Sequence, residues 1–108
     1  MLYHVRARLK EDTAPALLAK LTDGTVAGQQ PDGAEIIASL ERAVVNAQGE
    51  VEWSETCFCS TPLAHERDTV LDAHFERLTT EPIEAHTPYE GRKFMEYLSN
   101  CATALRAT

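Results

Sequence analysis

Apolar and polar residues alternate along the first nine positions, MLYHVRARL, which is the pattern of a strand with one buried face. The side chains on one side are apolar and those on the other are basic: Tyr3, Val5, Ala7 and Leu9 against His4, Arg6 and Arg8. A period of two residues places successive side chains on opposite faces of a sheet. We therefore predict a half-buried strand over residues 2–9.

Apolar residues at helical spacing follow in two segments. The first begins at Asp12 or Thr13 and ends before Gly24, a residue suited to a helix C-terminus. The second opens at Asp32, and Glu35 three residues later completes the pattern of a capping box. We predict helices over both segments, joined by a loop.

The second half of the chain contains two more predicted strands and two more predicted helices. The stretch EVEWSETCFC predicts a strand over residues 50–59, after a turn at 46–49. Thr61 and Pro62 start a helix that should run to about Leu78. A short strand is expected over 81–87, and a last helix starts at Thr87.

The predicted order is β-α-α-β-α-β-α within one α+β domain, residues 1–108. No internal repeat or linker divides the chain, and its length suffices for a core of its own. Helices that return between strands indicate a ferredoxin-like plan. We expect a small sheet of three to four strands with the helices packed on one face.

The opening strand also resembles a known family. MLYHVRARL is similar to the first strand of muconolactone isomerases and related dimeric α+β barrel proteins. That resemblance implies a ferredoxin-like fold and a homodimer that binds substrates between two facing sheets. It covers nine residues and carries no catalytic residue, so it implies no activity for this chain.

The charge balance excludes several classes of partner. The chain has 10 basic and 17 acidic residues, a net charge of −7, and no dense basic cluster. Such a surface repels phosphate, so we expect no nucleic acid and no anionic membrane as partner.

The N-terminal pattern is not that of a secretory signal. With three cysteines, an odd number, we expect free thiols and a cytoplasmic protein.

The outward side of the sheet is a candidate ligand-binding face. Alternation places His4, Arg6 and His86 there, together with the aromatic Phe58. One interpretation is a solvated face with cross-strand ion pairs, such as Arg6 with Glu52. The other is a homodimer whose two sheets enclose a polar cleft for a small molecule.

Cys57 and Cys59 form a C-x-C pair on the predicted strand. Their Cα atoms should lie about 6.5–7 Å apart, at or beyond the limit for an unstrained disulfide. Core packing is one interpretation, and ligation of a soft metal is another. A closed zinc site needs about four ligands, and His65 and His74 point to opposite sides of one helix. No complete ligand set is visible, so we expect no metal and no cofactor.

A thiol-based centre is the third interpretation. Cys59 precedes the start of a helix, where a thiolate is stabilised. On the following helix, Arg67 and His74 fall within the apolar arc. Cys59 would be the nucleophile, His74 its base and Arg67 an anchor for an anion. The alternative is that Arg67 extends outward to solvent and His74 is a core histidine bonded to a backbone carbonyl.

The leading functional prediction is a homodimeric module that binds a small ligand or a protein, with Cys57, His4, Arg6 and His86 as ligand contacts. The first alternative is a thiol-dependent enzyme or redox protein that uses Cys59. The second is a metal-binding protein that uses Cys57 and Cys59. Whether the protein is an enzyme stays open at this point.

Overall fold

The first strand of the chain lies inside an antiparallel sheet of five strands. In the computed structural model, which describes residues 1–106, the strand order is β4-β1-β3-β2-β5. Strand β1 (Leu2–Leu9) pairs antiparallel with β3 (Val51–Thr56) and with β4 (Phe75–Ile83). The short strands β2 (Val44–Val45) and β5 (Arg92–Lys93) extend the sheet beyond β3. The predicted α+β class is confirmed, but the sheet has five strands where three to four were predicted, because β2 and β5 had no signal in the sequence pattern.

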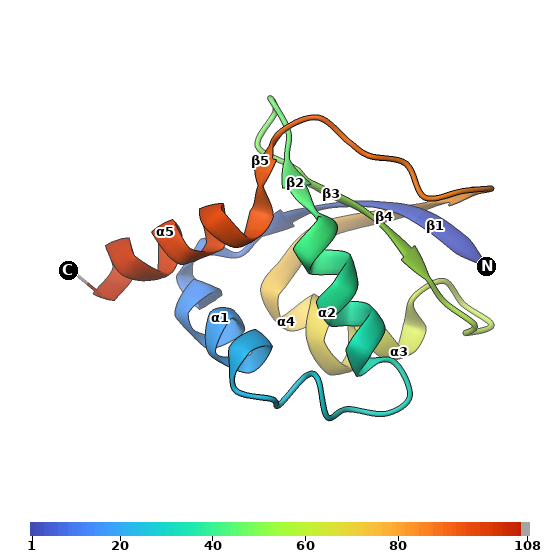
Figure 1. The fold of residues 1–108 in the computed structure, drawn as a ribbon, viewed down its shortest axis with the longest axis horizontal. Coiled ribbons are helices and arrows are strands. Elements are labelled where there is room, and N and C mark those ends of the chain that lie inside the picture. The colour runs from blue at the N-terminus through green and yellow to red at the C-terminus, as the bar shows by residue number, and fades with distance from the viewer. Residues whose placement is uncertain (107–108) are drawn as a thin grey trace.

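Helices connect the strands. A 3-10 turn, η1 (Glu11–Thr13), leads into α1 (Ala14–Thr22), and α2 (Gly33–Arg42) follows after a loop. The chain closes with α5 (Phe94–Arg106). Figure 1 shows α1, α2 and α4 together on one side of the sheet, with α5 at its end. Within residues 1–106, none of the helices has the length and apolar character that a membrane crossing requires.

One continuous helical segment connects β3 to β4. It consists of α3 (Ala64–Glu66), the π-helix η2 (Arg67–Leu71) and α4 (Asp72–His74). Leu63, directly before α3, has left-handed backbone geometry with φ 56° and a fully buried side chain. The turn at Leu63 lets the chain reverse from the loop after β3 into the helix.

The alternation predicted for β1 is confirmed. Tyr3, Val5, Ala7 and Leu9 are all buried on the helix side. They pack with residues of β3, the helices and β4 in one core, whose largest apolar members are Trp53, Phe75, Phe94, Leu17, Ile36, Leu40, Leu63, Leu71 and Leu98. Trp53, Phe75 and Phe94 stack in tilted pairs, with ring centroids 5.4 and 5.8 Å apart.

The outward face of the sheet is partly covered by residues 84–91, which we call the strap. Figure 1 shows the strap along the side of the sheet opposite α1, α2 and α4. Tyr89 of the strap stacks on His4 of β1 with ring centroids 4.4 Å apart. His86 of the strap bonds Ser54 of β3 at 2.6 Å. The strand predicted over 81–87 is therefore confirmed only at residues 81–83, the end of β4, and the predicted helix start at Thr87 is wrong.

The third predicted helix is too long at both ends. The helical segment begins at Ala64 and ends at His74, whereas Phe75 starts β4. Phe75 pairs with Leu9 across the sheet. Apolar residues at 75 and 78 fit a helical arc as well as a strand. Residues 75–78 form a strand because one edge of β1 would otherwise be unpaired, and pairing with β4 satisfies the backbone N–H and C=O groups along that edge.

The predicted strand over 50–59 ends early. Strand β3 stops at Thr56, so Cys57 and Cys59 lie in the loop after it and not on one strand face. Strand β2 is short, and it leaves the last residues of β3 without a strand partner on that edge. Side chains of α2 bond there instead: Arg42 donates to the Ser54 carbonyl at 2.8 Å, and Glu35 accepts from the Thr56 amide at 2.8 Å.

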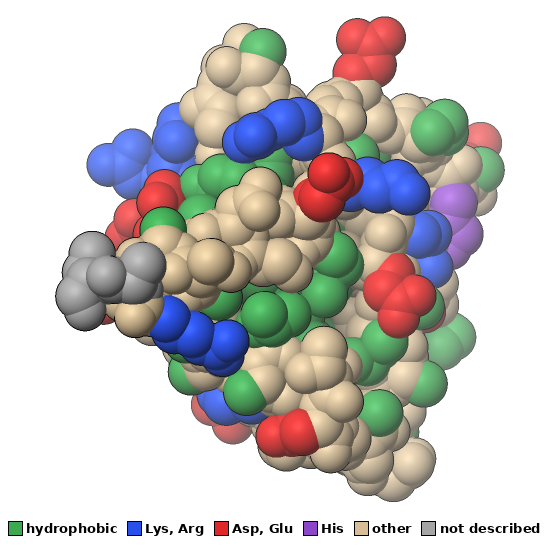
Figure 2. Space-filling view, turned by 60° about the vertical axis from the view of Figure 1, so that its left-hand side comes forward, with side chains coloured by type: hydrophobic (Ala, Val, Ile, Leu, Met, Phe, Trp, Pro, Cys, Tyr) green, Lys and Arg blue, Asp and Glu red, His purple; other side chains and the backbone are tan. Residues whose placement is uncertain are grey.

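Figure 2 brings the side of the molecule that carries α5 to the front. Charged side chains of both signs are scattered over this side, with hydrophobic side chains exposed between them. Although the net charge is −7, the acidic side chains do not gather into one acidic surface on this side.

Candidate functional site

A pocket of about 360 Å³ lies where the loop after β3 meets α2 and the start of α3. Its surface is mostly apolar but includes acidic, thiol and imidazole side chains; the lining residues are Pro31, Asp32, Glu35, Thr56, Cys57, Phe58, Cys59, His65 and Glu66. Phe58 at this loop is 91% exposed, so its ring is not part of the core. The pocket combines the predicted C-x-C pair with carboxylates from other elements.

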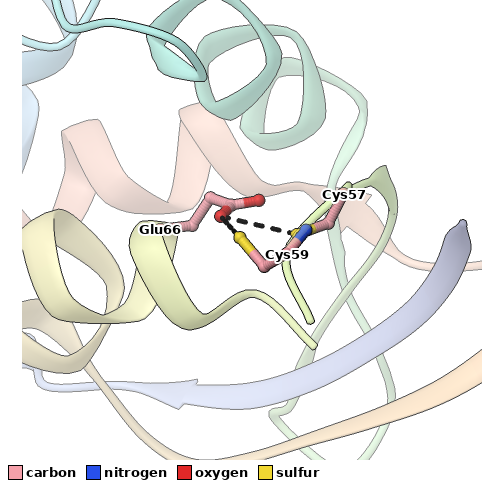
Figure 3. A group of neighbouring side chains, drawn as sticks. All are labelled: Cys57, Cys59 and Glu66. Atoms are coloured by element: carbon pink, nitrogen blue, oxygen red, sulfur yellow. Dashed lines mark hydrogen bonds between the residues drawn. The ribbon is translucent and has the colours of Figure 1, made fainter. Parts of the chain in front are cut away.

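The two cysteines converge on Glu66. Figure 3 shows Cys57 and Cys59 from the loop and Glu66 from α3 pointing toward one another. The thiols of Cys57 and Cys59 donate to the same Glu66 Oε1 at 3.6 and 3.5 Å. The Cys59 amide donates to Cys57 Sγ at 3.2 Å. Both sulfurs and a Glu66 oxygen lie within 4.8 Å of one another, the spacing of ligands around one metal ion.

Burial governs the chemistry of Cys57. Its side chain is only 3% exposed, and burial raises the pKa of its thiol to about 12. Hydrogen bonding with Cys59 and Glu66 acts in the same direction, although the Cys59 amide opposes it. Cys57 is therefore a neutral thiol at physiological pH in the metal-free protein, and a cation would have to displace its proton to bind the sulfur.

A second group of donors adjoins the first. Asp32, His65 and Glu66 each offer a ligand atom within 4.8 Å of the other two. His65 Nδ1 and Asp32 Oδ2 are 2.5 Å apart. Burial opposes ionisation of Asp32, but hydrogen bonds from His65 and Gln29 lower its pKa on balance. The bond to Asp32 raises the pKa of His65. The two side chains form an ion pair when His65 is protonated.

The capping box predicted at the start of α2 is wrong. Neither Asp32 nor Glu35 caps the helix, because both carboxylates are used elsewhere. Asp32 accepts from His65 and from Gln29, the latter at 3.0 Å. Glu35 accepts from the Thr56 amide and lies 3.6 Å from the Arg42 guanidinium. Both carboxylates bond residues that are distant in the sequence, not the amides of the first helical turn, and both line the pocket.

Glu55 lies behind the pocket, buried in the core. Its side chain is 1% exposed, and Trp53 Nε1 donates to its Oε1 at 2.7 Å. Burial raises the pKa of Glu55 to about 8, and the negative charges of Glu66 and Glu35 add to the shift. Glu55 Oε2 is the one buried side-chain polar atom in residues 1–106 that has no hydrogen-bond partner.

The three residues of the predicted thiol centre lie apart. Cys59 contacts Glu66, whereas Arg67 is solvent-exposed and pairs with Asp72 at 2.9 Å. His74 is buried and bonds Lys20 and Thr13, each at 2.9 Å. It lies eight residues beyond Glu66, about 12 Å along the helix. Arg67 leaves the core side because the π-helix does not follow the 3.6-residue spacing on which the predicted arc depends.

Of the residues predicted for the outward sheet face, His4, Arg6 and His86 lie on that side, away from the pocket, whereas Phe58 lies in the loop after β3 and lines the pocket. His4 Nε2 bonds Glu52 Oε1 at 2.9 Å, and His86 bonds Ser54 beneath the strap. Arg6 is opposite Glu52 in the sheet register, as predicted. The carboxylate of Glu52, however, bonds His4 and Asn46. The structure thus separates His4, Arg6 and His86 from Cys57, their predicted companion.

Sequence reasoning missed the two buried glutamates of the site, although signals for both were present. Glu55 has the same parity as Val51 and Trp53, which predicts that it faces the core. Glu66 follows Leu63 by three positions and precedes Val70 by four, which is the spacing of one helix face. An acidic residue on an apolar face is the informative observation, because a buried charge needs a partner.

Comparison with protein-family models, with curated proteins and with solved structures finds no significant match to this chain. Its fold and its side-chain geometry therefore supply the functional argument.

Proposed function

We propose that this protein binds a transition-metal ion of the zinc class through Cys57, Cys59 and Glu66. The observation that carries the proposal is the convergence of two sulfurs and a carboxylate oxygen within 4.8 Å. Thiolate and carboxylate ligands together suit Zn²⁺, whereas Mg²⁺ and Ca²⁺ prefer oxygen ligands alone.

The coordination would be open. Three protein ligands with a fourth position left for water or substrate is the arrangement of exchangeable and catalytic zinc sites, whereas structural sites are closed by four. The same residues line a pocket of about 360 Å³, a volume within the range of small-molecule sites. We propose that a small ligand reaches the ion through this pocket. For the ligand-binding module predicted from the sequence, we propose this pocket as the binding site.

Zinc titration of the protein, freed of metal by a chelator, tests the proposal. We expect one sulfur-bound ion per chain, visible with Co²⁺ as a thiolate-to-metal charge-transfer band. Cys59→Ser should reduce the band, because only Cys57 then supplies a thiolate, and should weaken binding by more than about 100-fold, because even supporting residues of metal sites contribute 10–100-fold. Cys59 is partly exposed, so the substitution should leave the fold intact.

Cys101→Ser is the matched control. Cys101 is also a partly exposed free thiol, but it lies on α5 and belongs to neither donor group. It should bind zinc as the unmodified chain does. Absence of binding at micromolar zinc, or equal losses in the two serine variants, would overturn the proposal.

A thiol enzyme, the other alternative, would have to use Glu66 as the base, since His74 lies elsewhere.

The finer predictions about the whole molecule also stand as proposals. We infer a ferredoxin-like plan from the order β4-β1-β3-β2, to which β5 and two helices are additions: one of the two helices between β1 and β2, and α5. The homodimer implied by the first-strand resemblance stays a prediction, and the strap would lie between the two sheets in such a dimer. A cytoplasmic location is supported by three free cysteines.

A further inference from the structure

Glu66 belongs to two donor groups at once. One of its groups contains Cys57 and Cys59, and the other contains Asp32 and His65, with the ligand atoms of each group within 4.8 Å of one another. Glu66 is 1% exposed and has two carboxylate oxygens. A carboxylate in this position can bind one ion with each oxygen, so the shared residue raises the question of a second cation.

The second group is held in place by a supporting shell. Gln29 donates to Asp32 Oδ1 at 3.0 Å and to Thr69 Oγ1 at 2.8 Å, while Thr69 donates to the His65 carbonyl at 2.7 Å. These bonds tie the loop before α2 to the start of the helix that carries His65. Metal ligands in proteins are typically oriented by such hydrogen bonds. Asp32 and His65 are thereby positioned together before any ion arrives.

Charge balance at the pocket favours more than one cation. Four carboxyl groups converge there, from Asp32, Glu35, Glu55 and Glu66. Among the described residues, their ion pairs are with His65 at 2.5 Å and Arg42 at 3.6 Å. Glu55 lies against Glu66 with its buried Oε2 unpartnered. Crowded, partly buried carboxylates repel one another unless protons or cations neutralise them, and Asp32, Glu35 and Glu66 share only those two cationic partners among the described residues.

We propose that the pocket holds two divalent ions bridged by Glu66, the second bound by Asp32, His65 and Glu66. This inference rests on the proposed function, which supplies the first ion at the two cysteines. The nitrogen and oxygen donors of the second position also suit Zn²⁺. On binding, the ion displaces to solvent the proton that joins His65 to Asp32, and both side chains turn toward the ion. Ions bridged in this way lie about 3.5–4 Å apart.

Native mass spectrometry during zinc titration tests the number of ions directly. We expect two per chain for the unmodified protein and for Cys101→Ser, but one for His65→Asn. The His65 side chain is 40% exposed, so this variant should fold. With Co²⁺, His65→Asn should keep the thiolate charge-transfer band, because the cysteine site is intact. Gln29→Ala should weaken only the second ion, by about 10–100-fold.

The outcomes separate this inference from the proposed function. No bound ion, or binding that Cys59→Ser leaves unchanged, overturns both. One ion per chain, with His65→Asn equal to the unmodified protein, overturns the second ion and leaves the first. X-ray absorption of the doubly loaded protein tests the bridge without a variant. A metal–metal distance of about 3.5–4 Å supports it, and two ions without that distance overturn it.

Discussion

His65 and His74 belong to the same helical segment, yet their surroundings give them opposite properties. His65 is partly exposed beside Asp32, which raises its pKa. His74 is 2% exposed, and burial lowers its pKa to about 4, with further lowering by the charges of Lys20 and Lys10. Residue type alone therefore did not identify which histidine belongs to the proposed metal site.

The protonation of His74 follows from its partners. Lys20 Nζ can only donate, so His74 Nε2 accepts from it. His74 Nδ1 then carries the proton and donates to Thr13 Oγ1, whose hydroxyl donates to the Lys10 carbonyl. The side chains of Lys20, His74 and Thr13 therefore all have hydrogen-bond partners when the His74 ring is neutral. A histidine in this environment is a structural residue and not a general base.

His74 predicts a pH dependence of stability. An unfolded histidine titrates near pH 6.5, whereas the folded one titrates near 4. Between these values the unfolded chain binds the extra proton, so stability falls as the pH falls from about 6.5 to 4. The loss should total about 2–3 kcal/mol. Urea unfolding of the metal-free protein at pH 7, 5 and 4 measures it.

His74→Gln isolates this contribution, because glutamine can also donate and accept but does not titrate in this range. The other acidic groups contribute equally to both proteins. We therefore expect the difference in unfolding free energy between the two proteins to shrink steadily below pH 6.5. A difference that stays constant from pH 7 to 4 would contradict a depressed pKa for His74.

At the scale of elements, strand β4 is where local sequence and tertiary structure disagree most. Residues 75–78 fit the apolar arc of the preceding helix, yet they pair with β1. The register shifts between Arg6 and Arg8, so that one residue of β1 faces two of β4. Arg77 lies in this bulge with φ 55°. Left-handed geometry is costly for any residue with a Cβ atom.

Arg77→Gly should therefore stabilise the protein, by about 0.5–1 kcal/mol. The gain from relieving the left-handed strain, about 1–2 kcal/mol, exceeds the entropy that glycine loses on folding. The Arg77 side chain is exposed, so little packing is lost. Thermal unfolding measures the change. Thr79→Gly, at a regular position of the same strand, should destabilise instead, and a gain from both variants would refute the bulge interpretation.

At the scale of the whole molecule, the sheet separates two surfaces with different roles. The pocket lies on the helix side, between α2 and α3, and the strap covers the other side. Tyr89 and His4 stack across the strap and β1, and they belong to neither donor group. The two surfaces should therefore respond independently to substitution.

Tyr89→Ala tests this independence. Loss of the stacked pair should lower the unfolding free energy by about 0.5–1.5 kcal/mol. Zinc affinity should stay within about twofold, because distant sites without shared partners behave additively. Urea unfolding and zinc titration of the same preparation give both numbers. A large loss of zinc affinity would show that the strap supports the pocket and that the sheet does not isolate the two sides.

How much of the fold was predictable depends on the range of the contacts involved. Alternation in residues 2–9 and helical spacing in the next two segments are local, and both predictions are confirmed because each element buries its own apolar side. The ends of β3, of the helical segment 64–74 and of β4 depend on strand pairing between distant parts of the chain, which local patterns do not determine. In the strap, Gly91 was a local signal against a helix that starts at Thr87, because glycine is unfavourable inside a helix.

The sequence by itself determined the α+β class, the buried face of the first strand and the C-x-C pair as the feature most worth testing. Only the tertiary structure decided which residues meet that pair. Asp32 and His65 are 33 positions apart, and they come together because α2 packs beside the start of α3. Spacing along a chain predicts neighbours within one element. Donors from separate elements converge only when the packing of the core has fixed how those elements lie against each other.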